Sequence, residues 1–209
     1  MHATFYIILA ITSAFGILFI KRLDNPFKLL SFFIFTVLVS EMINKYLVTK
    51  IGTNFPGMHV FSYVGVIFNG LIYDQVLKDN LRDRKIVFST TVIAITLLIL
   101  NLIYLEGFFE FPSHGLIINA FQIVIFVFLT YVKLLNNNHK RAIYTQATFW
   151  LNSGNFLFYG ITFNIFAFFN YLYIPENIDW TYALIKYANF AMYIFFFIAI
   201  VLNSNETNE

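Results

Sequence analysis

Seven stretches of almost unbroken apolar residues divide the chain, and short polar segments separate them. The stretches cover residues 4–20, 27–47, 58–77, 86–105, 116–135, 143–169 and 180–202. A helix that crosses a membrane needs about 20 mostly apolar residues, and the segments between the stretches contain the helix breakers Pro26, Pro56, Pro112 and Pro175. The pattern predicts an all-α membrane protein, a single domain over residues 1–209 that forms a bundle of seven transmembrane helices. Because the connections are short, sequential helices are expected to be antiparallel neighbours.

Composition supports this interpretation. Of the 209 residues, 59% are hydrophobic, 21% aromatic and 11% charged, whereas a soluble domain has about 25% charged residues. A disordered chain and a soluble domain are therefore excluded. The net charge of only +2 argues against nucleic-acid binding. The absence of cysteine excludes disulfides, thiolate metal sites and cysteine nucleophiles. No cofactor is predicted.

The positive charges are concentrated on one side of the predicted bundle. Lys45 and Lys50 are the two basic residues beside the even-numbered loops. The odd-numbered loops and their flanks carry ten: Lys21, Arg22, Lys28, Lys78, Arg82, Arg84, Lys85, Lys133, Lys140 and Arg141. Because basic loops stay in the cytoplasm, the amino terminus is expected outside and the carboxyl terminus inside a bacterial inner membrane. The first stretch has its positive charge behind it, which indicates a retained helix and not a cleaved signal peptide.

Two ionisable residues lie deep in predicted spans. Glu41 of the second span and Lys186 of the seventh are each about six residues, or ~9 Å, from the outer side. Opposite charges at one depth stabilise each other more strongly in a low dielectric than in water. We therefore expect Glu41 and Lys186 to approach each other. The alternative is that Glu41 pairs with Lys45 and that Lys186 extends to the outer headgroups.

Other polar residues are expected at a similar depth, on the second, third, fifth and seventh spans. Together with the two charges, they form a candidate ligand pocket that is open to the outside: Glu41, Asn44, His59, Tyr63, Asn119, Gln122, Lys186 and Asn189. Ordinary hydrogen bonding between helices is the alternative interpretation.

A second polar set is expected near the middle of the membrane. In the sixth span, Asn152, Asn155, Tyr159 and Thr162 have the spacing i, i+3, i+7 and i+10, which places them on one helix face. Asn69 and Tyr73 of the third span reach a similar depth. Such a face must point inward, because unsatisfied polar groups are costly in lipid. It serves either as interhelical glue, which we favour, or as a conduit. Gly154 and Gly160 are expected to let a neighbouring helix approach closely.

Several chemistries lack the residues that they need. The histidines show no metal-binding spacing, so no metal site is predicted. Asp74 is the one aspartate inside a span and is expected to pair with Lys78 at i+4, which leaves no aspartate pair for an intramembrane protease. Lys186 has no carboxylate counter-ion in the middle of the third span, which argues against a retinal protein.

Three short sequences carry a family resemblance: SEMINKY at residues 40–46, YDQVLK at residues 73–78 and FWLNSG at residues 149–154. They resemble a group of small seven-span proteins of Bacteroidota, which are similar to modules that precede histidine kinases. The pattern is matched at Glu41, Asn44, His59, Tyr73, Trp150, Asn152 and Tyr159. The chain departs from it at Gly65 and Asn119, where the family tends to carry glutamates. The resemblance implies a sensory or accessory role without naming a ligand.

The leading hypothesis is a non-enzymatic sensor or accessory protein that signals to a cytoplasmic partner. The predicted docking residues are Arg82, Arg84, Lys140 and Arg141, and a homo-oligomer is a possible assembly. The alternative is a channel, a transporter or a membrane-acting effector linked to a bacterial defence system of the CRISPR type. A third hypothesis is a lipid-modifying enzyme that uses Glu41 and His59.

Overall fold

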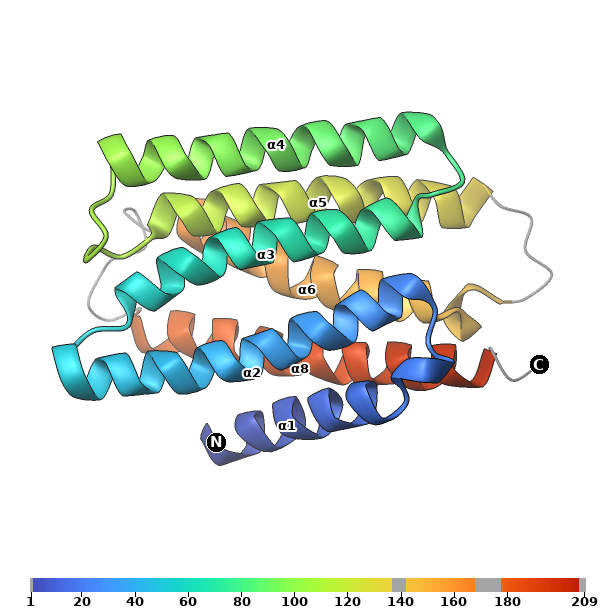
Figure 1. Cartoon of the computed structure of the whole chain (residues 1–209), viewed down its shortest axis with the longest axis horizontal. Helices are drawn as coiled ribbons and strands as arrows, with labels where there is room; N and C mark the ends of the chain where they lie inside the picture. The colour runs from blue at the N-terminus through green and yellow to red at the C-terminus, as the bar shows by residue number, and fades with distance from the viewer. Residues whose placement is uncertain (1, 137–141, 168–177, 207–209) are drawn as a thin grey trace.

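A computed structural model describes residues 2–136, 142–167 and 178–206, and this part of the chain is entirely helical. Two 3-10 turns, Ile20–Arg22 and Ile143–Thr145, precede α2 and α6. The α-helices, labelled in Figure 1, are α1 (His2–Leu18), α2 (Asn25–Ile51), α3 (Phe55–Val76), α4 (Leu81–Tyr104), α5 (Ser113–Asn136), α6 (Ala147–Ala167) and α8 (Ile178–Glu206). The predicted all-α class is confirmed.

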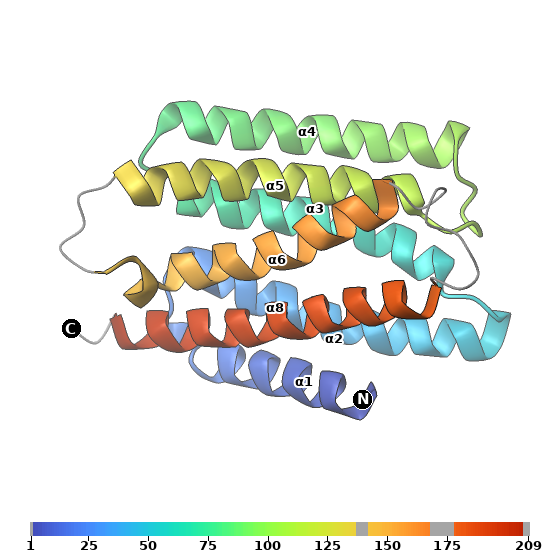
Figure 2. The same cartoon turned by 180° about the vertical axis from the view of Figure 1, so that it is seen from behind.

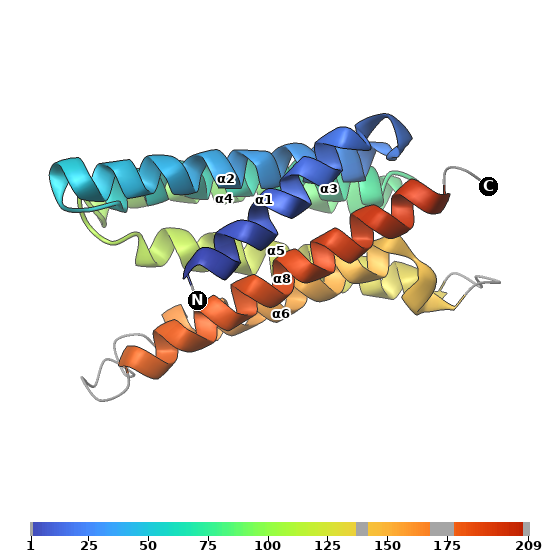
Figure 3. The ribbon, with the colours of Figure 1, turned by 90° about the horizontal axis from the view of Figure 1, so that it is seen from below.

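The helices run along the long axis of an elongated bundle. α1, α2, α3, α5, α6 and α8 follow one another around a ring, and α4 packs outside the ring against α3 and α5. Figures 1 and 2 show α4 and α1 at opposite edges of the bundle. Figure 3 shows α2, α3 and α4 on one side and α5, α6 and α8 on the other, with α1 running diagonally between α2 and α8. α1 therefore covers the junction between the first and last long helices.

Local sequence explains where α2 begins and ends. Pro26 lies in its first turn, where a residue without an N–H costs no hydrogen bond. Gly52 ends the helix with φ +79°, a left-handed conformation that glycine adopts without a steric penalty. Asp24, just before α2, is joined to Asn203 of α8 by two hydrogen bonds of 2.9 Å. The Asp24 N–H donates one of them, and Asn203 Nδ2 donates the other.

The sixth predicted stretch starts differently from the expectation. Residues that were expected to begin the helix at position 143 instead form the turn Ile143–Thr145, and α6 begins at Ala147. Thr145 Oγ1 donates to the Ala142 carbonyl at 2.6 Å, and Trp150 Nε1 donates to the Tyr144 carbonyl at 2.8 Å. These bonds hold the turn against the first helical turn of α6, a detail that hydrophobicity alone does not predict.

Within the described residues, five helices are long and apolar enough to cross a membrane: α2, α3, α4, α5 and the part of α8 from residue 183. α1 has 17 residues, which corresponds to ~25 Å, somewhat less than the ~30 Å of the hydrocarbon core. Large apolar side chains, such as Leu18, Phe88 and Phe128, are exposed on the outside of the bundle. The protein is a helical membrane protein by this evidence.

The predicted role of the two glycines in α6 holds for one of them. A Cβ atom at Gly154 would lie 3.2 Å from the Met192 carbonyl oxygen of α8, so α8 approaches α6 closely there. At Gly160, no atom of the described residues lies within 4 Å of such a Cβ atom, and the expectation is wrong at this position.

We call one end of the bundle the basic end. It carries the connections from α1 to α2 and from α3 to α4. Its described basic residues are Lys21, Arg22, Lys28, Lys78, Arg82, Arg84, Lys85 and Lys133. The opposite end carries the connections from α2 to α3 and from α4 to α5.

Candidate functional site

The polar face of α6 points into the bundle, as its spacing predicts. Asn152, Asn155, Tyr159 and Thr162 are all buried. The Tyr73 hydroxyl of α3 donates to Asn152 Oδ1 and accepts from Asn155 Nδ2, each at 2.9 Å. Asn152 Nδ2 donates to the Val127 carbonyl of α5 at 3.1 Å. We call Tyr73, Asn152 and Asn155 the midplane network. Its members form hydrogen bonds with one another, and the bond from Asn152 to Val127 extends the network from α3 and α6 to α5.

Two further members of the predicted polar stripe are held by nearby groups. Asn69 Nδ2 donates to the Gly65 carbonyl at 2.8 Å, and Asn69 also interacts with the hydroxyl of Tyr159. Thr162 Oγ1 donates to the Phe158 carbonyl, one helical turn earlier, at 2.8 Å. The bonds to Gly65 and Phe158 lie within a single helix, whereas the contact between Asn69 and Tyr159 joins α3 to α6. That contact between helices is of the kind expected of interhelical glue.

Glu41 occupies a different environment at the junction of α1, α2 and α8. The Tyr6 hydroxyl of α1 interacts with its carboxyl, and Tyr193 of α8 is close enough to feel its charge. Tyr193 is buried and packs edge-on against Phe5 of α1, with ring centroids 5.8 Å apart. A carboxylate on the second helix therefore faces two tyrosines from the first and last helices. Sequence reasoning missed both tyrosines because tyrosine is abundant in this chain.

The expected ion pair between Glu41 and Lys186 is wrong. Within the described part of the chain, the ion pairs of 4.0 Å or less include neither Glu41–Lys186 nor the alternative Glu41–Lys45. Lys186 instead lines a small cavity of about 120 Å³ beside Thr4 and Phe5. α1 packs against both α2 and α8. Its residue Phe5 lines the same cavity as Lys186, and the next residue, Tyr6, interacts with the Glu41 carboxyl. The first helix thus intervenes where the sequence suggested direct contact.

Asn44 and Asn189, predicted to belong to the same pocket, each have a buried carbonyl oxygen without a hydrogen-bond partner in the described structure. The Asn44 side chain lies directly over the Cα of Gly57 in α3, where a Cβ atom would collide with it. Asn189 lies on the face of α8 that also carries Lys186 and Tyr193, at spacings of three and four residues. We call Tyr6, Glu41, Lys186, Asn189 and Tyr193 the α1 seam.

The other predicted pocket residues lie at other interfaces. His59 Nε2 is 3.1 Å from the Glu110 carbonyl oxygen, which can only accept, so this nitrogen carries the proton. Its ring stacks on Phe108, and His59 therefore anchors the loop between α4 and α5. Tyr63 packs beside Val66 and two apolar residues of α4.

Asn119 and Gln122 lie where α5 meets α3 and α4. Asn119 Nδ2 would be 2.8 Å from a Cβ atom at Gly65, so Asn119 of α5 and Gly65 of α3 are in contact. Gln122 Nε2 donates to Thr91 Oγ1 at 3.0 Å and to the Val66 carbonyl at 3.3 Å. The side-chain oxygens of Asn119 and Gln122 are buried and lack a partner within the described ranges. The eight predicted pocket residues are thus distributed over several interfaces and do not line one pocket in the described structure.

A carboxylate that sequence reasoning did not select is the most heavily bonded one described. Glu106, in the loop between α4 and α5, is 6% exposed. It accepts from Asn101 Nδ2 at 2.7 Å, from Ser113 Oγ at 2.6 Å, and from the backbone N–H and Nδ1 of His114 at 2.8 and 2.7 Å. Burial alone would raise the pKa of Glu106, but these hydrogen bonds outweigh it and lower the pKa. Its hydrogen-bond donors come from the end of α4 and the start of α5, and they form no short sequence motif from which the site could be predicted.

At the basic end, the predicted docking residues differ in their bonding. Arg84 forms a two-pronged contact with Asp74, at 2.8 and 3.1 Å. The expected pair of Asp74 with Lys78 is therefore wrong, because the neighbouring antiparallel helix presents a guanidinium whose geometry fits a carboxylate better. Arg82 is exposed. Lys140 and Arg141 lie outside the described residues.

A second contact holds the loop between α3 and α4 at this end. Lys133 Nζ of α5 donates to Asp79 Oδ2 at 2.9 Å and to the Val76 carbonyl at 2.8 Å. The hydrogen bond and the positive charge of Lys133 lower the pKa of Asp79.

Searches for similar proteins return no match: no protein-family model, no curated protein and no solved structure resembles this chain.

Proposed function

We propose that this protein is a membrane-embedded sensor or accessory protein whose stimulus acts at Glu41 in the α1 seam. The observation that carries the proposal is the environment of this carboxylate. It lies within an apolar helix, faces two tyrosines of other helices and has no cationic partner in the described part of the chain. Ionisable groups inside membrane helices are costly to retain and mark functional sites.

The chemistry of the seam indicates what would bind there. A carboxylate and two phenolic oxygens accept hydrogen bonds, so the fitting stimulus is a small cation or a ligand with a hydrogen-bond donor. α1 contacts both α2 and α8 at this seam, and α2 and α8 are joined at the basic end by Asp24 and Asn203. A change in the packing of α1 would therefore reach the basic end through two linked helices.

The proposal includes seven spans, with the amino terminus outside and the basic end in the bacterial cytoplasm. Because the chain has no cysteine, single-cysteine variants test this arrangement directly. Phe109→Cys lies in the loop between α4 and α5, and Leu81→Cys at the start of α4 is 73% exposed at the basic end. A membrane-impermeant maleimide should label Phe109→Cys in intact cells and Leu81→Cys only after permeabilisation. The reverse labelling would overturn the orientation.

The signalling role is tested by a photoreactive amino acid placed at Leu81. In native cells, the probe should crosslink to a cytoplasmic partner, and Glu41→Gln should change the yield about fivefold or more if the seam controls the partner. Thr36→Val is the matched control, because Thr36 lies on the same helix and bonds only to its own preceding turn, at 2.8 Å to Phe32. Equal yields in all three proteins would overturn the proposal.

A second readout separates the sensor from the channel or effector alternative. Purified protein in liposomes should carry no ion flux above that of empty liposomes. A flux that is present in the native protein and lost in Glu41→Gln would overturn the sensor in favour of an ion path through the seam.

A further inference from the structure

The basic-end cations on α4 and α5 fall into two groups. Arg84 and Lys133 are engaged by Asp74 and Asp79. Arg82 and Lys85 are exposed, and neither forms an ion pair with any described residue. The second group is therefore available to bind an external anion.

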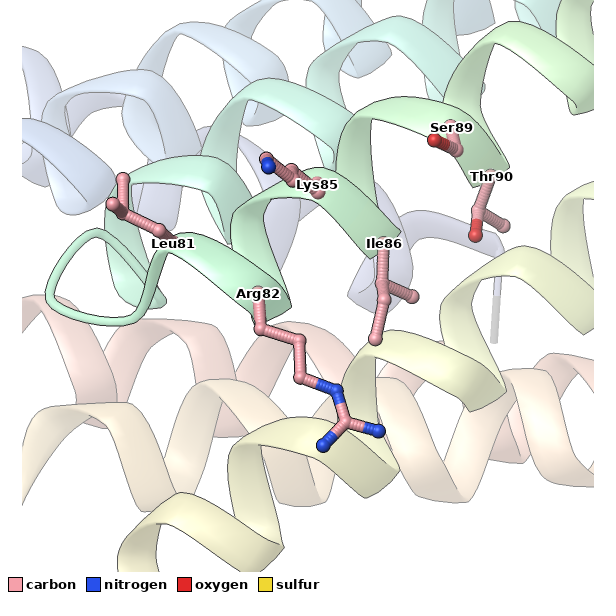
Figure 4. Close-up of a pocket in the computed structure, with 6 residues that line it drawn as sticks. All are labelled: Leu81, Arg82, Lys85, Ile86, Ser89 and Thr90. Carbon is pink, nitrogen blue, oxygen red and sulfur yellow. The ribbon is translucent and has the colours of Figure 1, made fainter.

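Arg82 and Lys85 line a surface depression of about 470 Å³ on α4. Its other lining residues are Leu81, Ile86, Ser89 and Thr90, and Figure 4 shows Arg82 and Ile86 extending from the same side of the helix. The depression thus combines two positive charges with two hydroxyl groups, and none of its lining residues is a carboxylate. An anion fits it better than a zwitterion, because the positive group of a zwitterion would find two cations and no carboxylate among the lining residues.

An apolar cleft of about 360 Å³ continues from this depression toward the opposite end. Thr90 lines both. The cleft lies between α4 and α5, and its lining includes Ile93 and Leu97 of α4, Ile117, Phe121 and Gln122 of α5, and Phe163 of α6. Its amide, on Gln122, is held by hydrogen bonds to α3 and α4, and the remaining lining is almost entirely hydrocarbon.

The depression and the cleft follow one helical stripe. Arg82, Ile86, Thr90, Ile93 and Leu97 are separated by three or four residues and so share one face of α4. From Arg82 to Leu97 the stripe rises ~22 Å at 1.5 Å per residue. One leaflet of a bilayer, with its headgroups, is also about 20–22 Å thick. The stripe therefore has the length, charge and apolarity of a lipid that lies along it.

We infer that this face of α4 binds one anionic phospholipid from the leaflet at the basic end. The lipid phosphate contacts Arg82 and Lys85, with Ser89 and Thr90 as hydroxyl donors below it, and one acyl chain occupies the cleft between α4 and α5. The inference requires the membrane-spanning bundle but not the sensor role of Glu41, so the two fail independently.

The test is native mass spectrometry of the purified full-length protein with lipids of matched acyl chains. Phosphatidylglycerol should bind about tenfold or more tightly than phosphatidylcholine, and Arg82→Gln/Lys85→Gln should remove that preference, because two charge-assisted contacts are lost. Lys21→Gln/Lys28→Gln removes the same charge elsewhere at this end and should leave the preference intact. An equal loss in both double variants would overturn the site, since net charge alone would then explain binding. Unchanged binding in the first variant, or equal binding of the two lipids, would also overturn it.

Two further measurements test whether the ligand is a lipid and not a soluble anion, and whether a loss of binding reflects the site and not misfolding. Glycerol phosphate at the same concentration should not displace phosphatidylglycerol, and displacement would show a soluble-anion site instead. Ile93→Trp narrows the cleft at an exposed position and leaves both cations in place. It should weaken phosphatidylglycerol binding while gel-filtration behaviour stays native. Full binding by this variant would overturn the assignment of the acyl chain.

Discussion

The midplane network and the α1 seam both place polar groups inside an apolar bundle, but they differ in how those groups are bonded. In the midplane network, Tyr73 exchanges hydrogen bonds with Asn152 and Asn155, and Asn152 also bonds to α5. In the α1 seam, Glu41 has no ionic partner within the described ranges, and the carbonyl oxygen of Asn189 has no hydrogen-bond partner there. Depth and burial therefore do not distinguish structural polar groups from candidate functional ones. The two regions differ instead in how fully their polar atoms are hydrogen-bonded.

The difference follows from the cost of an unpaired buried group. A satisfied network contributes to stability, whereas each unsatisfied donor or acceptor costs about 1–3 kcal/mol. Residues of the first kind should be intolerant of substitution for reasons of stability. Residues of the second kind should be replaceable at little cost in stability and should matter for ligand response instead.

The largest expected loss of stability comes from Asn152→Ala in the midplane network. The substitution leaves the Tyr73 hydroxyl without its acceptor and the Val127 carbonyl without its donor, which should cost about 3 kcal/mol. Thermal unfolding in detergent measures the loss. Asn164→Ala on the same helix is the control, because the Asn164 side chain is exposed and bonds only to its own preceding turn. Equal unfolding temperatures for the two variants would contradict a structural role for the network.

A somewhat smaller loss is expected from Glu106→Gln, which changes another saturated group. A glutamine side chain cannot accept all four of the donors that meet the carboxylate, so we expect a cost of about 2 kcal/mol near neutral pH. The folded-state pKa lies below the ordinary value of 4.5. The carboxylate therefore stabilises the fold above that value, and the contribution is lost as the pH falls through the lowered pKa.

The measurement is the difference in unfolding temperature between native protein and Glu106→Gln along a pH series. The difference should be constant above pH 4.5 and should shrink at more acidic pH. A difference that grew on acidification would show that the protonated carboxyl is the form that stabilises the loop.

The sequence predicts the helices well because apolar stretches and helix breakers act locally. Pro26 lies in the first turn of α2 and Gly52 ends the helix, and each effect depends on backbone geometry alone. The turn before α6 was not predictable in this way, because Trp150 and Tyr144 stabilise it through a contact that hydrophobicity does not encode. The i, i+3, i+7 spacing likewise located the inward face of α6, since periodicity determines which residues share a face.

Partner choice was the part that the sequence could not supply. Depth alone suggested Glu41 and Lys186 as a pair, but α1 packs against both of their helices, where Tyr6 interacts with Glu41 and Phe5 lines the same cavity as Lys186. Asp74 pairs with Arg84 of the adjacent helix and not with Lys78, its neighbour at i+4. Both outcomes depend on packing between helices that are distant in sequence, and a single sequence carries no direct signal of that packing.

Glu41→Gln should not lower the free energy of unfolding, unlike the first two variants. The substitution removes a charge that no described cation neutralises, so unfolding in detergent should show unchanged stability or a gain of about 1 kcal/mol. The same variant should alter the crosslinking yield at Leu81. A loss of stability as large as that of Asn152→Ala would place Glu41 among the structural groups and remove the distinction between the two regions.

The smallest effect is expected from Asn119→Ala, which repeats the substitution at Asn152 in an unsaturated setting. Both asparagines are buried, at 4% and 0% exposure, and both lose the same atoms. Asn119 has an unpartnered side-chain oxygen in the described structure, whereas Asn152 bonds to two helices. The loss at Asn119 should therefore stay below about 1 kcal/mol, mostly from packing. Because volume and residue type cancel between the two variants, the gap in their unfolding temperatures reports hydrogen bonding. If the gap is absent, cavity formation and not hydrogen bonding governs the stability of both sites.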